Sequence, residues 1–265
     1  MAFSTINPYT GETVKQFKDA TDSEINAAIS RADETFREWR ELNISQRTVI
    51  LQKAADILRE KNQYFAEIIT LEMGKIIGEA RAEVELSANI FEYYVKNAQK
   101  LLADEPLPVA DPAEGKAVLV HQPLGVILAI DPWNFPFYQI ARILAPQLAA
   151  GNTLLLKHAS NVPQCAEAFE QLMRDAGLPE GGFTNLFLPH TKIETVLKDP
   201  RVQGVALSGS EAAGASVAHT AAKHLKTSTL ELGGADAIVV LADAVLDKTA
   251  DSAGFGRHWT AGHVL

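Results

Sequence analysis

From residue 125 onward, short apolar runs alternate with longer amphipathic stretches, and this alternation restricts the fold more than any other feature of the sequence. Strands buried on both faces read as continuous apolar runs, and a crossover helix usually joins one parallel strand to the next. The pattern therefore predicts an α/β fold, with a Rossmann-like parallel sheet and flanking helices. The predicted strands are residues 125–130, 153–156, 183–188, 204–207 and 237–241, and the predicted helices between them are residues 136–151, 162–179 and 211–225.

A helical region precedes this sheet. Thr21 and Glu24 have the spacing of a capping box, and apolar residues then recur at helical intervals over residues 25–36. Three more helices are predicted, one after Ser45, one ending near Gly74 and one over residues 79–100, followed by a connecting loop with three prolines over residues 104–115.

The composition excludes several classes of protein. Acidic residues outnumber basic ones by 33 to 24, and the net charge is −9 without a basic block, so nucleic-acid binding is not expected. No apolar run is long enough to cross a membrane, and the first residues do not resemble a secretory signal, so we expect a cytoplasmic protein. The one cysteine, Cys165, excludes an internal disulfide and a cysteine-built zinc site. His219 and His224 are too far apart in sequence to share one helix face, so we assign no metal.

Four polar or glycine-rich motifs directly follow predicted strands, which is where ligands bind in open α/β sheets. They are residues 131–136 (DPWNFP), 157–160 (KHAS), 208–210 (SGS) and 231–234 (ELGG). Taken one by one, residues in and near these motifs also have structural interpretations. Asn134 can cap the following helix, Lys157 can extend to solvent, Ser210 can be an ordinary helix cap, Glu231 can end an edge strand and Arg142 can face solvent.

In this order and spacing, the four motifs resemble those of the aldehyde dehydrogenase superfamily, and the sequence LEMGK at residues 71–75 agrees with it. The resemblance covers essentially the whole chain and is closest to the bacterial succinate-semialdehyde dehydrogenases, partly because of Lys-His-Ala at residues 157–159. It implies NAD(P)-dependent oxidation of an aldehyde to a carboxylic acid. It also implies an N-terminal helical part of the cofactor-binding domain (1–116), a bridging strand (117–124), a Rossmann-like NAD(P)-binding domain (125–231) and the beginning of a truncated catalytic domain (232–265).

The resemblance implies two catalytic residues. Asn134 would donate its side-chain amide to the oxyanion that forms when a thiolate adds to the aldehyde, an effect of about 3 kcal/mol at comparable sites. Glu231 would be the general base that activates the hydrolytic water, a role favoured by an apolar environment. Gly233 and Gly234 would leave room for the nicotinamide.

Six residues are assigned to a cofactor that the resemblance implies to be NAD or NADP. Lys157 would bind the adenine-side ribose, and Ser160 lacks the carboxylate with which many NAD-preferring relatives repel a 2′-phosphate. The other four are Gly209 and Ser210, whose N–H groups at a helix start suit a pyrophosphate, Leu232, whose backbone would meet the nicotinamide, and Trp133.

Arg142 follows Asn134 by eight residues, about 12 Å along a helix. In semialdehyde dehydrogenases of this family a similarly placed arginine binds the carboxylate. The resemblance therefore implies a short aldehyde with an acid group, such as succinate semialdehyde, as the small-molecule partner. It also implies a homo-oligomer for full-length members.

The mechanism of the family needs a cysteine whose thiolate adds to the aldehyde. This cysteine closes a sequence similar to Gly-Gln-Val-Cys, and the matching residues here are Gly262, His263, Val264 and Leu265. Cys165 falls in a predicted helix on the cofactor side, where we expect a buried structural thiol. Two interpretations follow: a fragment or shortened form of an active enzyme, inactive alone, or a nucleotide-binding pseudo-enzyme that works as an interaction module.

Overall fold

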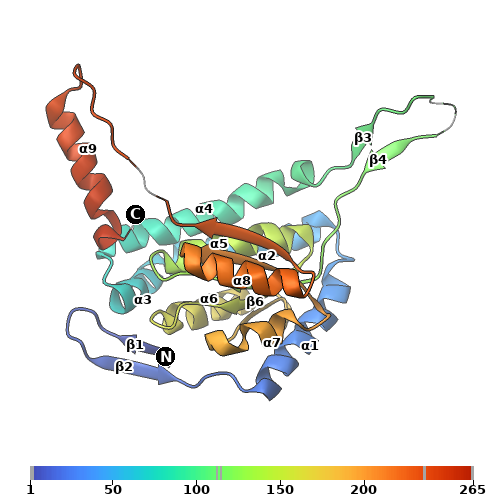
Figure 1. The fold of residues 1–265 in the computed structure, drawn as a ribbon, viewed down its shortest axis with the longest axis horizontal. Coiled ribbons are helices and arrows are strands. Elements are labelled where there is room, and N and C mark those ends of the chain that lie inside the picture. The colour runs from blue at the N-terminus through green and yellow to red at the C-terminus, as the bar shows by residue number, and fades with distance from the viewer. Residues whose placement is uncertain (1–2, 112, 114, 235–236, 264–265) are drawn as a thin grey trace.

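A five-stranded parallel sheet in the order β7-β6-β5-β8-β9 lies at the centre of the chain (Figure 1). The computed structural model describes residues 3–111, 113, 115–234 and 237–263. The predicted α/β class with a Rossmann-like parallel sheet is confirmed. The strands are β5 (Val126–Ile130), β6 (Thr153–Lys157), β7 (Phe183–Asn185), β8 (Val202–Gly209) and β9 (Thr227–Leu232).

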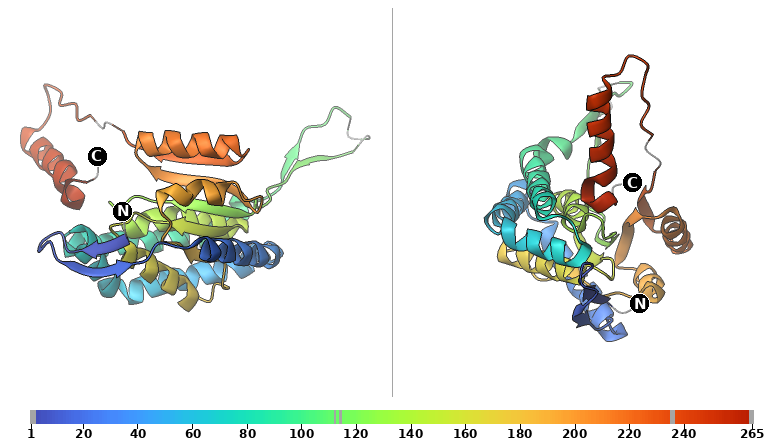
Figure 2. Two further views of the ribbon diagram at one scale, coloured as in Figure 1. Left: turned by 60° about the horizontal axis from the view of Figure 1, so that its bottom comes forward. Right: turned by 90° about the vertical axis from the view of Figure 1, so that its left-hand side faces the viewer.

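Helices cover both faces of this sheet. Successive strand residues point to opposite sides, and in β5 and β6 the side chains on both sides are buried. Ile127 and Ala129 belong to a core shared with helices on one face, whereas Val126 and Leu128 belong to a core shared with helices on the other. Figure 2 shows these layers from two further sides. The first face carries α2 (Ile44–Glu60), α3 (Asn62–Met73), α4 (Ile77–Leu101), α5 (Pro136–Ala150) and α6 (Pro163–Asp175), and the second carries α1 (Asp22–Trp39), α7 (Ile193–Leu197) and α8 (Glu211–Lys223).

Local signals set the ends of the N-terminal helices. The predicted capping box of Thr21 and Glu24 begins α1, and α3 ends at Gly74, whose left-handed φ of 77° suits glycine. The helix expected after Ser45 begins slightly earlier, at Ile44, since Asn43 forms the capping box of α2 with Gln46.

Two predictions about regular structure are wrong. Within residues 104–115, β3 (Glu105–Leu107) pairs antiparallel with β4 (Ala117–Leu119) in a hairpin that projects from the body (Figure 1). Each strand of a two-stranded hairpin has a free edge, so Pro106 is tolerated. Residues 237–241 form no strand, and their apolar side chains from Ile238 to Leu241 are exposed.

Several elements were not predicted from the sequence, α7 and β9 among them. The strands β1 (Phe3–Ile6) and β2 (Thr13–Phe17) pair antiparallel near the N-terminus, and α9 (Leu246–His258) lies apart from the sheet near the C-terminus (Figure 1).

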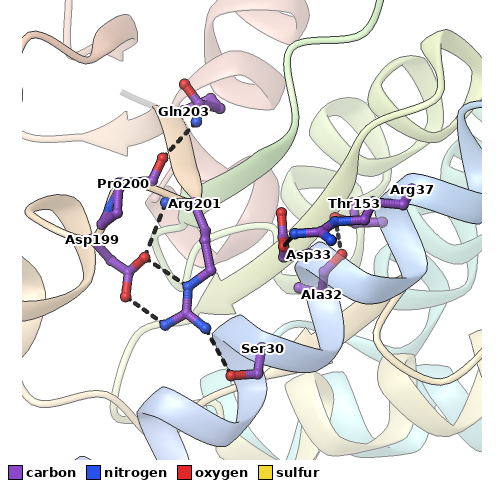
Figure 3. Close-up of polar contacts among 9 residues, drawn as sticks. All are labelled: Ser30, Ala32, Asp33, Arg37, Thr153, Asp199, Pro200, Arg201 and Gln203. Atoms are coloured by element: carbon purple, nitrogen blue, oxygen red, sulfur yellow. Dashed lines mark hydrogen bonds and ion pairs between the residues drawn. The ribbon is translucent and has the colours of Figure 1, made fainter.

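Polar contacts tie α1 to the ends at which the strands begin (Figure 3). Arg201, just before β8, pairs with Asp199 at 2.6 Å and donates to Ser30 Oγ at 2.7 Å. Thr153 Oγ1, at the start of β6, donates to the carbonyl of Ala32 at 3.0 Å. This edge of the sheet is opposite to the one that carries the four motifs.

Among the described residues, every helix is too short or too polar to cross a membrane. The same residues contain no cluster of histidine, cysteine and acidic side chains that could hold a metal ion.

Candidate functional site

A cavity of about 590 Å³ lies at the carboxyl ends of β5, β8 and β9. It gathers residues from three of the four motifs and from α5, so segments far apart in sequence meet at one edge of the sheet. Of the predicted site residues, those that line it are Trp133, Asn134, Arg142, Gly209, Ser210, Glu231 and Leu232.

Lys157 and Ser160, from the remaining motif, are not among the residues that line this cavity. Lys157 ends β6 and is buried, so the interpretation that it extends to solvent is wrong. Its ammonium donates to the carbonyl of His158 at 3.3 Å, and burial lowers its pKa. Ser160 is half-buried, and its carbonyl accepts from the N–H of Ser4 at 3.0 Å. Lys157 is thus the last residue of the strand next to β5, and Ser160 lies just beyond the carboxyl end of that strand.

Asn134 does not cap the helix that follows it. The N-cap position of α5 is Phe135, and the Nδ2 of Asn134 instead donates to the carbonyl of His263 at 3.0 Å. Its Oδ1 is buried and has no partner among the described residues. The structural interpretation of Asn134 as a cap is therefore wrong, and its side-chain amide lines the cavity.

Arg142 and Glu231 contact each other across the cavity. Nη2 of Arg142, on α5, lies 2.9 Å from Oε2 of Glu231, at the end of β9. The Glu231 side chain is 57% exposed, so the apolar environment expected for it is absent. Exposed ion pairs contribute about 0 to 1 kcal/mol, so a competing carboxylate can displace this one.

The helix-capping interpretation of Ser210 is correct. Ser210 is the N-cap of α8, and its Oγ accepts from the N–H of Ala213 at 3.3 Å. The preceding Ser208 is buried, and its Oγ has no hydrogen-bond partner within the described residues. Glu211 is exposed, so its carboxylate is in contact with solvent. The cavity therefore has a helix N-terminus and a free hydroxyl on its β8 side.

Three further residues belong to the site although they were not predicted as site residues. Gln139 and Ser208 line the cavity, and Asp131 is buried directly after the last residue of β5. Neither carboxylate oxygen of Asp131 has a partner in the described part of the chain, and burial raises its pKa to about 7 despite the charges of Arg142 and Lys157. Gln139 stands three residues before Arg142, a helical spacing that places the two on one face.

His158 and Cys165 support the site from the interior. Nε2 of His158 lies 3.0 Å from the carbonyl of Pro136, and burial lowers the pKa of this imidazole to about 4. Cys165 is fully buried on α6, as expected, and burial raises the pKa of its thiol. Both side chains are therefore in their neutral form near pH 7.

The last described residues run into the cavity. Thr260 and Ala261 have left-handed φ angles of 55° and 53°, and Glu79 accepts from the N–H of Thr260 at 2.8 Å. The ring of His263 lies 4.5 Å from that of Trp133. Val264 and Leu265, the latter at the expected nucleophile position, lie outside the described residues.

Comparison with known proteins agrees with this arrangement. The model of the aldehyde dehydrogenase family matches residues 1–264. A succinate-semialdehyde dehydrogenase [NADP(+)] of Deinococcus radiodurans is 49% identical over 96% of this chain and 53% of its own length. A probable succinate-semialdehyde dehydrogenase [NADP(+)] of Synechocystis is 48% identical over 94% of this chain and 54% of its own length.

Solved structures give the same result. The succinic semialdehyde dehydrogenase of Streptococcus pyogenes, in complex with NADP+, superimposes with a TM-score of 0.95 at 43% identity, over 99% of this chain and 57% of that one. The chain thus spans just over half the length of the relatives that it matches. With the family model matched over nearly every residue and the fold shared with solved members, the chain belongs to the aldehyde dehydrogenase family.

Proposed function

We propose that this chain forms the cofactor-binding part of an NADP- or NAD-dependent dehydrogenase that oxidises an aldehyde with a carboxylate at its far end, such as succinate semialdehyde. The observation that carries the proposal is that Asn134, Arg142 and Glu231 line the same cavity as Gly209 and Ser210. The relatives named above act on succinate semialdehyde, and their names specify NADP.

The residues beyond the carboxyl ends of the strands fit a dinucleotide. The ammonium of Lys157 has three N–H donors, and one of them is used by the His158 carbonyl, so donors remain for ribose hydroxyls. The N-terminus of α8 suits a pyrophosphate, because its first N–H groups and the helix dipole favour anions. Ser160 carries no charge that would repel a 2′-phosphate. When bound, the nicotinamide would accept the hydride from the substrate.

The side chains that line the cavity suit the binding of the substrate and the activation of water. The Nδ2 of Asn134 donates to a carbonyl oxygen at 3.0 Å, and the same donor suits an oxyanion formed from the aldehyde. A substrate carboxylate would take the place of Glu231 beside Arg142. Glu231 would then be free to accept a proton from water, so binding of an acid-ended substrate would itself release the general base.

Calorimetric titration of the folded chain with NADP and with NAD tests the cofactor assignment. We expect measurable binding, weakened about 10-fold or more in Lys157→Met, which removes charge-assisted hydrogen bonds, but unchanged in Lys53→Met at an exposed position of α2. Arg142→Met should likewise weaken binding of succinate semialdehyde to the dinucleotide complex. Failure of both dinucleotides to bind at millimolar concentration, with circular dichroism showing a folded chain, would refute the proposal.

A further inference from the structure

The helix that follows Asn134 is capped by a residue from another helix. Phe135, at the N-cap of α5, makes no side-chain capping bond within the described structure, and Pro136 has no N–H to offer. The next two N–H groups, of Phe137 and Tyr138, both donate to Oε1 of Glu83 on α4, at 2.8 and 3.2 Å. Glu83 therefore replaces the local cap that Asn134 does not supply.

Lys75 holds this glutamate in place. Lys75 and Glu83 are both almost completely buried, and the Lys75 ammonium donates to Oε2 of Glu83. The same ammonium lies 3.7 Å from the centre of the Phe135 ring, over its face. The pair thus contacts the residue directly after Asn134 and the two N–H groups at the start of α5.

A second buried glutamate makes the same contacts at the neighbouring helix. Glu72 on α3 accepts from the N–H groups of Gln164 and Cys165 at 2.9 and 2.8 Å, at the second and third positions of α6. This helix also begins with a proline and lacks a side-chain cap of its own in the described structure. It carries none of the residues that line the cavity, so it provides an internal comparison.

We propose that Glu83, held by Lys75, is a positioning residue for Asn134: it caps α5 from α4 and so leaves the Asn134 amide free to face the cavity. The inference rests on the proposed function only in giving that amide its catalytic purpose. A buried glutamate that loses its amide partners is costly, and an amide side chain that caps its own helix cannot point at a substrate. The remote cap resolves this conflict.

The test compares Glu83→Gln with Glu72→Gln in the 15N-labelled chain. The side-chain amide resonance of Asn134 is identified by its loss in Asn134→Asp. We expect this resonance to shift in Glu83→Gln and to stay in place in Glu72→Gln. Hydrogen exchange should accelerate about 10- to 100-fold at Phe137 and Tyr138 in the first variant, and at Gln164 and Cys165 in the second.

A second variant covers the case in which Glu83→Gln does not fold. Lys75→Met keeps the backbone bonds of Glu83 and removes the ammonium over Phe135, and we expect it to shift the Asn134 resonance as well. An unchanged resonance despite faster exchange at Phe137 would overturn the proposal, as would equal shifts in Glu83→Gln and Glu72→Gln. The measurement needs no dinucleotide, so a failed cofactor titration would refute the proposed function and leave this result standing.

Discussion

Replacing Asp131 with asparagine should stabilise the chain at alkaline pH but not at acid pH. Asp131 is buried at the end of β5 with both carboxylate oxygens unpaired in the described structure, and burial raises its pKa from 3.8 to about 7. Asparagine has nearly the same shape and does not titrate. The difference in unfolding free energy between the two proteins therefore reports the ionisation of this one carboxyl.

The sign and size follow from proton linkage. The folded chain holds the Asp131 proton more tightly than the unfolded chain. The contribution of this proton to the free energy of unfolding is therefore fully present below pH 3.8 and is lost as the pH rises through 7. A shift of about 3 units corresponds to about 4 kcal/mol in total, of which about 3 kcal/mol is lost between pH 4.5 and pH 8. That is a large part of the 5 to 15 kcal/mol by which a typical domain is stable.

Urea unfolding of both proteins at pH 4.5 and pH 8 measures this effect. Other titrating groups are common to the two proteins and largely cancel in the difference. Asp251→Asn, at an exposed position of α9, controls for the loss of one negative charge. If the difference between wild type and Asp131→Asn is the same at both pH values, Asp131 is already solvated or paired, and the reasoning fails.

The remaining predictions concern the interior and the C-terminal end. The pKa of His158 is lowered from 6.5 to about 4, so its contribution to the free energy of unfolding is fully present above pH 6.5, and about 3 kcal/mol is lost as the pH falls to 4. Urea unfolding of His158→Gln should lack this loss. A pH profile of stability identical to that of the wild type would contradict the prediction. Hydrogen exchange should be slow in β5, β6 and β8 and fast over residues 237–258, where Ile238 to Leu241 are exposed. Equal protection of both regions in a monomer would show that the C-terminal end packs on its own.

Features that depend on neighbouring residues were predictable from the sequence. The capping box at Thr21, the end of α3 at Gly74 and the apolar strands β5 and β6 follow from local spacing, burial on both faces and the conformational freedom of glycine. The sequence also predicts that the motif residues meet at one edge, because a parallel sheet brings the carboxyl ends of its strands together, and residues of three motifs line one cavity.

Features that depend on distant partners were not predictable. Residues 237–241 are apolar enough for a strand, but a strand also needs a neighbour to pair with. Conversely, β9 has exposed side chains and little apolar signal, yet it pairs with β8 along its length. The contact between Arg142 and Glu231 requires α5 to lie beside the end of β9, which no local pattern specifies.

The capping of α5 by Glu83 and of α6 by Glu72 affects the order in which the chain can acquire structure. Glu72 and Glu83 precede the helices that they cap by 92 and 54 residues, counted to Gln164 and Phe137. During synthesis, the acceptors leave the ribosome well before their donors, and the starts of α5 and α6 have no nearby side chain to stabilise an isolated turn. We expect these turns to become stable only when α3 and α4 pack against α5 and α6, because α3 and α4 carry the accepting carboxylates. At the starts of α5 and α6, we therefore expect helix formation to accompany the assembly of the layers. A chain divided between α4 and β5 would leave two buried carboxylates in one piece and two helix starts without partners in the other.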